Sequence, residues 1–195
     1  MSQNQNIEIE FKNMLTKEEY AALLAHFHIK EEDLFEQENH YFDTSNFALK
    51  ANHSALRIRQ KNGEYELTLK QPHPDGLLET NKVLSKEESD TIFRTGKIKD
   101  EQISRLLEKM NIDPAAILYF GSLRTVRAEK TIGNGLLVLD HSFYLKKEDY
   151  ELEYEVSNRE EGEIYFTELL STLKIPVRKT KNKVRRFYEE KYKQK

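Results

Sequence analysis

Polar, mostly charged residues alternate strictly with apolar ones in four separate segments of this chain. In residues 7–12, the charged residues Glu8, Glu10 and Lys12 alternate with apolar ones. The same alternation returns at residues 56–59, 66–70 and 151–156. Successive side chains of a β-strand point to opposite faces, so each segment predicts a strand with one charged and one apolar face. If such a sheet closes into a barrel, its charges gather around one axis, and its apolar outer face needs helices to cover it.

Turn and cap signals divide the rest of the chain into strands and helices. Thr16 and Glu19 have the spacing of a helix capping box, and Asn62-Gly63 is typical of a tight hairpin turn. Further turns are predicted at residues 72–76 and 133–135. The predicted strands cover residues 7–13, 38–43, 55–60, 64–71, 77–84, 116–131, 136–143 and 150–156. The predicted helices cover residues 18–27, 101–110, 160–173 and 181–193, with a further short helix after Ser85.

These elements define the expected fold. Short turns between most strands favour antiparallel pairing. A closed barrel of about eight strands has an interior that side chains or one small ligand can fill. The predicted fold is therefore of the α+β class, an eight-stranded antiparallel β-barrel tunnel with flanking helices, in a single domain over residues 1–195.

The composition argues against several classes of protein. The 31 Lys and Arg residues nearly balance the 34 Asp and Glu residues, and the net charge of −3 disfavours a general nucleic-acid binder. The chain has no cysteine, which excludes disulfides and thiolate zinc sites, and its six histidines show no metal-ligand spacing. Its apolar runs are too short to span a bilayer, and the polar start MSQNQN lacks an apolar signal region. We therefore expect a cytoplasmic protein without a membrane segment.

A series of short motifs resembles one known family. The motifs are EIEFK (8–12), YFDT (41–44), ALRIRQ (55–60), LTLK (67–70), LETN (78–81), the strand with Arg127, then Asp140, ELEYE (151–155) and TKNKVRRF (180–187). Their content and order resemble the CYTH superfamily, the triphosphate tunnel metalloenzymes, and are most similar to uncharacterised bacterial members of the Bacillus type. The resemblance covers nearly the whole chain and includes the alternating segments described above.

The resemblance implies a function. Members of the family bind a triphosphate or a triphosphate-bearing substrate with a divalent metal inside an antiparallel eight-stranded tunnel. They include inorganic triphosphatases, thiamine triphosphatases, RNA triphosphatases and class IV adenylyl cyclases. We therefore expect a metal-dependent triphosphatase that acts on a small molecule, most simply inorganic triphosphate. Two alternatives stay open, a non-catalytic sensor of polyphosphate or nucleotide and an adenylyl cyclase.

Cationic side chains are the candidates for binding phosphate, because several positioned Lys and Arg residues hold phosphate groups best. The candidates are Lys12, Arg57, Arg59, Lys70, Arg127 and Lys183. Arg124 lies three positions before Arg127, so plain alternation places it on the opposite face unless a bulge redirects it.

The carboxylates suggest a metal site, since they would repel a phosphate unless a hard cation lay between them. Mg²⁺ and Mn²⁺ take oxygen ligands of this kind. The candidate metal ligands are Glu8, Glu10, Glu151, Glu153 and Asp140, and Glu79 is a further interior candidate. The triple alternation at residues 151, 153 and 155 leaves open which of these glutamates bind metal.

The expected reaction is metal-assisted attack of water on a terminal phosphoryl group, with Glu8, Glu10 and Lys12 as the catalytic residues. A structural interpretation competes with this one. The same charges could form cross-strand ion pairs, for example between Arg57 or Arg59 and the glutamates Glu8 and Glu10. The basic run at residues 178–186 is interpreted as a solvated helix face in preference to a nucleic-acid contact.

Overall fold

The computed structural model describes residues 4–193, which contain all the predicted strands. The strands are β1 (Gln5–Leu15), β2 (Phe35–Thr44), β3 (Ala55–Lys61), β4 (Glu64–His73), β5 (Gly76–Leu84), β6 (Ile117–Ile132), β7 (Gly135–Tyr144) and β8 (Lys147–Val156). The helices are α1 (Lys17–His26), α2 (Ala48–Ala51), α3 (Lys86–Thr95), α4 (Glu101–Lys109), α5 (Arg159–Thr172) and α6 (Lys183–Lys193), with 3₁₀ turns η1 (Glu31–Asp33) and η2 (Pro114–Ala116).

The strands form one hydrogen-bonded sheet whose order is β1-β5-β4-β3-β2-β6-β7-β8, and this order closes as a barrel. The registers of β1 with β8, of β2 through β5, and of β6 through β8 are antiparallel. The predicted eight-stranded antiparallel barrel with flanking helices is therefore confirmed. No helix within residues 4–193 is long and apolar enough to cross a membrane.

The chain divides into two compact units. The first contains the residues up to Ile7 and Glu38–Ser122, and the second contains Glu8–Gln37 and the residues from Leu123 onward. The expectation of one domain over residues 1–195 stays a prediction.

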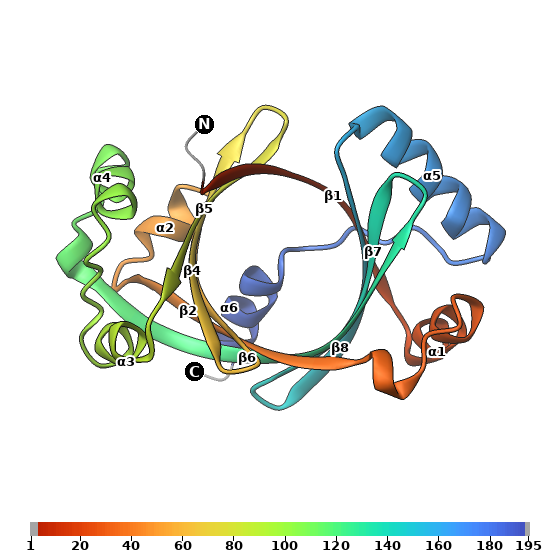
Figure 1. Cartoon of the computed structure of the whole chain (residues 1–195), viewed down its shortest axis with the longest axis horizontal. Helices are drawn as coiled ribbons and strands as arrows, with labels where there is room; N and C mark the ends of the chain where they lie inside the picture. Colours follow the sequence, from red (N-terminus) through yellow and green to blue (C-terminus); the bar gives the residue numbers. More distant parts are fainter. Residues whose placement is uncertain (1–3, 194–195) are drawn as a thin grey trace. The chain divides into compact units, whose positions relative to one another are not determined.

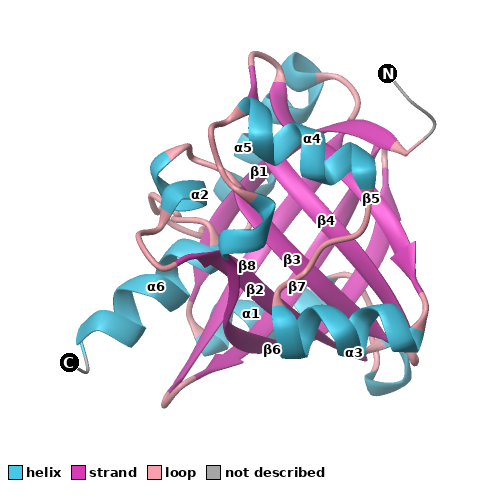
Figure 2. Ribbon diagram, turned by 90° about the vertical axis from the view of Figure 1, so that its left-hand side faces the viewer, coloured by secondary structure: helices cyan, strands magenta, loops and turns pink. Residues whose placement is uncertain are grey.

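The first unit packs helices against the apolar face of a three-stranded meander. β3, β4 and β5 run side by side (Figure 2), and α3 lies against β4 and β5 (Figure 1). Leu56 and Ile58 of β3 and Leu67 and Leu69 of β4 share a buried cluster with residues of α3 and α4. These are the apolar members of the alternating segments, so the helices cover the face that the sequence predicts.

Local signals start and stop the first unit's elements. Ser85 accepts a hydrogen bond from the Glu88 amide and Glu88 caps in return, so α3 begins with a capping box. α3 ends at Gly96, whose φ of 70° favours glycine. A Cβ at this position would lie 1.8 Å from the Ile117 carbonyl oxygen, so a side chain here would displace the start of β6.

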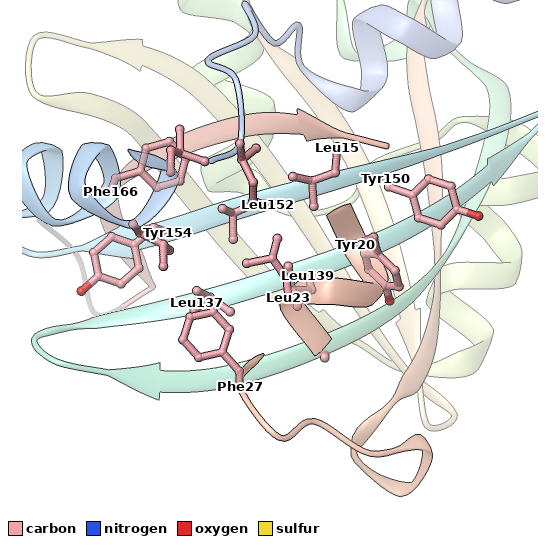
Figure 3. Packing of buried hydrophobic residues seen from close by; sticks show 14 residues of the cluster. Leu15, Tyr20, Leu23, Phe27, Leu137, Leu139, Tyr150, Leu152, Tyr154 and Phe166 are labelled. Carbon is pink, nitrogen blue, oxygen red and sulfur yellow. The ribbon is translucent and has the colours of Figure 1, made fainter. Parts of the chain in front are cut away.

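The second unit has its own core, shown in Figure 3. Leu137 and Leu139 of β7 and Leu152 of β8 are fully buried and pack with Leu23 of α1 and Phe166 of α5. The predicted capping box at Thr16 and Glu19 opens α1. Here too the helices cover the apolar face of strands whose other face is charged.

The short helix α2 was not predicted from the sequence. The carboxylate of Asp43, within the YFDT motif, accepts hydrogen bonds from the amides of Thr44 (2.7 Å), Leu49 (2.9 Å) and Lys50 (3.1 Å). These bonds hold the four-residue α2, which is too short to show a helical period. Asp43 therefore has a structural role.

The turn predicted at residues 72–76 is shorter than expected, because β4 continues to His73 and β5 begins at Gly76.

Candidate active site

The charged residues of the second unit lie on one face of four strands. Directly opposite residues of an antiparallel sheet share a face. The register places opposite each other Lys12 and Glu153, Glu10 and Glu155, Asp140 and Glu151, and Arg127 and Asp140. This face is opposite to the one that packs on α1 and α5, so we call it the charged face of the second unit.

Three buried carboxylates on this face each contact two cations. The carboxylates are Asp140, Glu151 and Glu153, and the cations are Arg127, Lys183 and Arg186. Arg127 donates two hydrogen bonds of 2.7 Å to the Asp140 carboxylate in a bidentate geometry. The Lys183 ammonium lies 2.8, 2.7 and 2.6 Å from Asp140, Glu151 and Glu153. Lys183 of α6 thus joins two strands of the sheet through one ammonium.

These contacts keep Glu153 and Lys183 ionised. Burial raises the pKa of Glu153, but the Lys183 ammonium and the Arg127 guanidinium outweigh burial and hold this pKa well below its usual value. Burial lowers the pKa of Lys183, but Asp140 and Glu151 raise it well above its usual value. Glu153 and Lys183 are therefore both charged near neutral pH, and removal of one partner would leave a buried charge uncompensated.

A second group of carboxylates on the same face is less well compensated. Lys12 forms an ion pair with Glu10. Glu155 forms no ion pair within residues 4–193, and its pKa is raised to about 7 by burial and by the nearby charges of Glu8, Glu153 and Glu10. Negative charge is therefore in excess around Glu155.

This excess bears on the predicted metal site. No group of three or more His, Asp or Glu side chains among residues 4–193 is already arranged around a metal position. The donor chemistry nevertheless fits a hard divalent cation, because carboxylate oxygens that repel one another are what such a cation would neutralise. Oε1 of the fully buried Glu151 also has no hydrogen-bond partner among these residues, whereas its Oε2 accepts from Arg186.

The first unit has a charged face of its own. Arg57 lies opposite Thr68, and Lys70 lies opposite Glu79, all on the face away from α3 and α4. Lys70 lies 2.6 Å from the Glu79 carboxylate and Arg57 lies 4.0 Å from it. Arg59 donates a hydrogen bond of 3.4 Å to Asn39. The predicted candidates Arg57, Arg59, Lys70 and Glu79 thus share one face of this unit.

Arg124 lies apart from the second unit's charged face, as alternation predicts. Its guanidinium pairs with Glu36 and stacks over the Phe143 ring at 4.4 Å from the ring centroid. The side chain is 46% exposed, whereas that of Arg127 is 7% exposed. Arg127 is therefore the arginine of β6 that joins the buried network.

The sequence interpretation missed the residues that hold α6 in place. Arg186 donates to Asp149 (2.9 and 3.2 Å) and to Glu151 (2.8 Å), and the Tyr144 hydroxyl donates to Asp149 (2.7 Å). Lys183 and Arg186 are three residues apart, a spacing that places them on one face of a helix. That spacing, within TKNKVRRF, is the signal that could have identified Arg186.

One cavity of the first unit lies away from the charged face. A cavity of about 300 Å³ is lined by Leu67, Leu84, Ile92 and polar residues of α3, α4 and their connection. Leu67 belongs to the helix-covered face of β4, so this cavity is separate from the charged face of the first unit.

Comparison with known proteins agrees with the architecture. The CYTH domain family matches residues 6–188. A "putative triphosphatase", YjbK of Bacillus subtilis (strain 168), is 54% identical over 192 residues, which cover 97% of this chain and 98% of that protein.

Two solved structures are similar in fold. A "putative adenylate cyclase" of Bacillus halodurans is 42% identical, with a TM-score of 0.92 over 95% of this chain and 100% of that one. HpAC1 of Hippeastrum, a "putative adenylyl cyclase" described as having a dominant triphosphatase activity, is 22% identical, with a TM-score of 0.77 over 94% of this chain and 96% of that one. From the family match and the relative at 54% identity, this chain belongs to the CYTH domain family.

Proposed function

We propose that this protein is a metal-dependent triphosphatase, with inorganic triphosphate as its simplest substrate. The observation that carries the proposal is the charged face of the second unit, where fixed cations adjoin carboxylates with excess negative charge. The family membership and the triphosphatase name of the relative at 54% identity support the same reaction.

Glu8, Glu10 and Glu155 are the proposed ligands of a divalent metal, Mg²⁺ or Mn²⁺. The metal would act as a Lewis acid that neutralises charge on the phosphoryl oxygens. The other predicted ligands, Asp140, Glu151 and Glu153, each hold two cations and serve mainly to position them. Of these three, Glu151 retains an oxygen without a partner that a metal could use.

The cations are proposed to bind the phosphates. Lys12, Arg127 and Lys183 provide this charge in the second unit, and Arg57, Arg59 and Lys70 are the candidates in the first. The bidentate contact with Asp140 fixes the Arg127 guanidinium in place. The guanidinium therefore needs to move little when negative charge develops on a phosphoryl oxygen.

No protein nucleophile is required for the reaction. Water, oriented by a carboxylate of Glu8 or Glu10, attacks the terminal phosphoryl group of tripolyphosphate. The bridging P–O bond to that group breaks, so orthophosphate and pyrophosphate are formed and a proton is released to solvent. Lys12 is proposed to neutralise charge on the transferred group, and its ion pair with Glu10 supports this role.

The test is phosphate release from tripolyphosphate with Mg²⁺ or Mn²⁺, for the wild type and for Glu10→Gln. We expect Glu10→Gln to lose at least a hundredfold in kcat with little change in the unfolding midpoint. Glu36→Gln is the matched control, because its 62%-exposed side chain pairs with Arg124 on the other face. Equal activity of Glu10→Gln and Glu36→Gln would refute the role of Glu10.

A non-catalytic sensor is the second candidate. The observation that favours it is that the cations Lys12, Arg127, Lys183 and Lys70 already contact carboxylates, so a ligand could exchange ion pairs without any chemistry. Calorimetry with tripolyphosphate distinguishes the two: tight binding with no phosphate release supports the sensor.

Adenylyl cyclase is the third candidate, because the similar structures from Bacillus halodurans and Hippeastrum bear cyclase names. Incubation with ATP and Mn²⁺, followed by detection of cyclic AMP, tests it directly.

A cytoplasmic location is also proposed, since a chain without cysteine suits a reducing compartment.

A further inference from the structure

Thr68 is a fully buried hydroxyl residue on the charged face of the first unit. It lies in the centre of β4, directly opposite Arg57 of β3 and Asn81 of β5. Its neighbours along the strand, Leu67 and Leu69, point to the other face and pack in the helix-covered core. The Thr68 side chain therefore belongs to the same face as Arg57 and Lys70.

The Thr68 hydroxyl has no hydrogen-bond partner among residues 4–193, although its residue is 0% exposed. Arg57 Nε, on the directly opposite residue, is likewise buried and without a partner among these residues. Asn81, opposite Thr68, donates its amide nitrogen to Asn6 (3.1 Å), and its Oδ1 is a further buried atom without a partner among these residues. A buried polar group without a partner costs stability, so two such donors side by side need an explanation.

Other buried threonines of the sheet show how unusual Thr68 is. Thr125 of β6 lies 3.3 Å from the Ser142 hydroxyl, and Thr80 of β5 accepts a hydrogen bond of 3.0 Å from Gln5. Both are 0% exposed, as Thr68 is. Burial alone therefore does not leave a threonine of this sheet without a partner.

The surroundings indicate what kind of group would satisfy the pair. Arg57 Nε–H can only donate, and the Thr68 hydroxyl can donate beside it. Lys70, two residues along β4, and the Arg57 guanidinium bring positive charge to the same place. An anionic oxygen is the acceptor that such donors favour.

We propose that Thr68 is a phosphate-binding residue, whose Oγ–H donates to a non-bridging phosphate oxygen held by the Arg57 Nε–H. This deepens the proposed function and rests on it, because the phosphate is that of the proposed triphosphate substrate. Thr68 supplies a neutral donor among cations, which fixes the position of the oxygen by geometry as well as by charge.

The test compares Thr68→Val, which keeps the shape and removes the hydroxyl, with Thr68→Ser, which keeps the hydroxyl. In the absence of ligand, we expect Thr68→Val to raise the unfolding midpoint by about 2 °C, because it removes an unsatisfied group. Its affinity for tripolyphosphate, measured by calorimetry in EDTA, should fall about tenfold, and KM with Mn²⁺ should rise by a similar factor. Thr68→Ser should stay within about threefold of the wild type in tripolyphosphate affinity and in KM.

Thr125→Val is the matched control, because its hydroxyl has a partner. It should lower the unfolding midpoint and leave tripolyphosphate affinity unchanged. If Thr68→Val lowers the midpoint, or binds tripolyphosphate as the wild type does, the inference is wrong while the proposed function stands. If the wild type neither binds nor hydrolyses tripolyphosphate, the proposed function and this inference fall together.

Discussion

At the scale of single residues, the balance between burial and ion pairing decides the behaviour of each charged group. Glu79 and Lys183 are clear examples, since each is almost fully buried and each has at least two oppositely charged neighbours. Burial opposes charge on both residues, and the neighbours outweigh it. Such groups contribute to stability only while their partners are present and ionised.

Glu79 predicts a pH dependence of stability. Burial raises its pKa, but Lys70 and Arg57 outweigh burial and lower the pKa from 4.5 to about 2. A lowered pKa in the folded state stabilises the fold above the unfolded pKa, and this stabilisation is lost as the pH falls from 4.5 towards 2. The contribution is about 3 kcal/mol.

Urea unfolding between pH 2 and pH 7 checks this expectation. Glu79→Gln should be less stable than the wild type at pH 7, and the difference should shrink as the pH falls below 4.5. Glu36→Gln, which alters an exposed pair, should follow the wild type within about 0.5 kcal/mol. A Glu79→Gln deficit that is constant across the range would contradict the assignment.

Lys183 predicts a large loss of stability on replacement. Lys183→Met leaves three buried carboxylates with one cation fewer, so the free energy of unfolding should fall by about 3–5 kcal/mol. Lys181→Met removes a 47%-exposed ammonium that pairs with Glu189, and should cost less than about 1 kcal/mol. Chemical denaturation of both variants compares them directly, and equal losses would show that Lys183 does not bind the carboxylates.

At the scale of elements, α6 depends on ionic contacts with β7 and β8 as well as on apolar packing. Phe187 and Tyr188 of α6 are buried. Arg186 donates a hydrogen bond to the Asp149 carboxylate, which also accepts one from the Tyr144 hydroxyl. The strands β7 and β8 form a hairpin with its own core, so they do not need α6 to pair with each other. We therefore expect α6 to exchange its amides before the hairpin does.

Asp149→Asn tests the ionic part of this attachment. The change weakens the contacts to Arg186 and so should speed hydrogen exchange of the amides of α6 about tenfold, with little effect in β7 and β8. Glu148→Gln is the control on the neighbouring residue, because Glu148 pairs with His141 of β7. Unchanged protection of α6 in Asp149→Asn would show that apolar packing alone holds the helix.

At the scale of the whole molecule, local pattern predicted the strands and their faces, and it failed where contacts are long-range. Alternation at Glu8, Arg57 and Glu151 identified the charged faces, because side-chain direction in a strand depends only on position. Capping boxes fixed the starts of α1 and α3 for the same local reason. The strand count and the family resemblance together led to the barrel.

The ionic partners could not be predicted in this way. Lys183 contacts carboxylates that lie 30–43 residues earlier in the chain, and no local pattern specifies that α6 returns to β7 and β8. The raised pKa of Glu155 could not be predicted without the strand register, which places Glu155 opposite Glu10 instead of opposite a cation. The metal ligands and the phosphate-binding residues remain proposals for these reasons.

Product analysis with a panel of substrates tests the proposed triphosphatase activity at the level of the whole protein. Purified protein is incubated with tripolyphosphate, nucleoside triphosphates or thiamine triphosphate, each with Mg²⁺, Mn²⁺ or EDTA. A metal-dependent triphosphatase should release orthophosphate only when the metal is present, most rapidly from tripolyphosphate, and Glu10→Gln should lose this activity. Absence of orthophosphate from every substrate with either metal, or cyclic AMP as the main product from ATP, would show that the protein is not a triphosphatase.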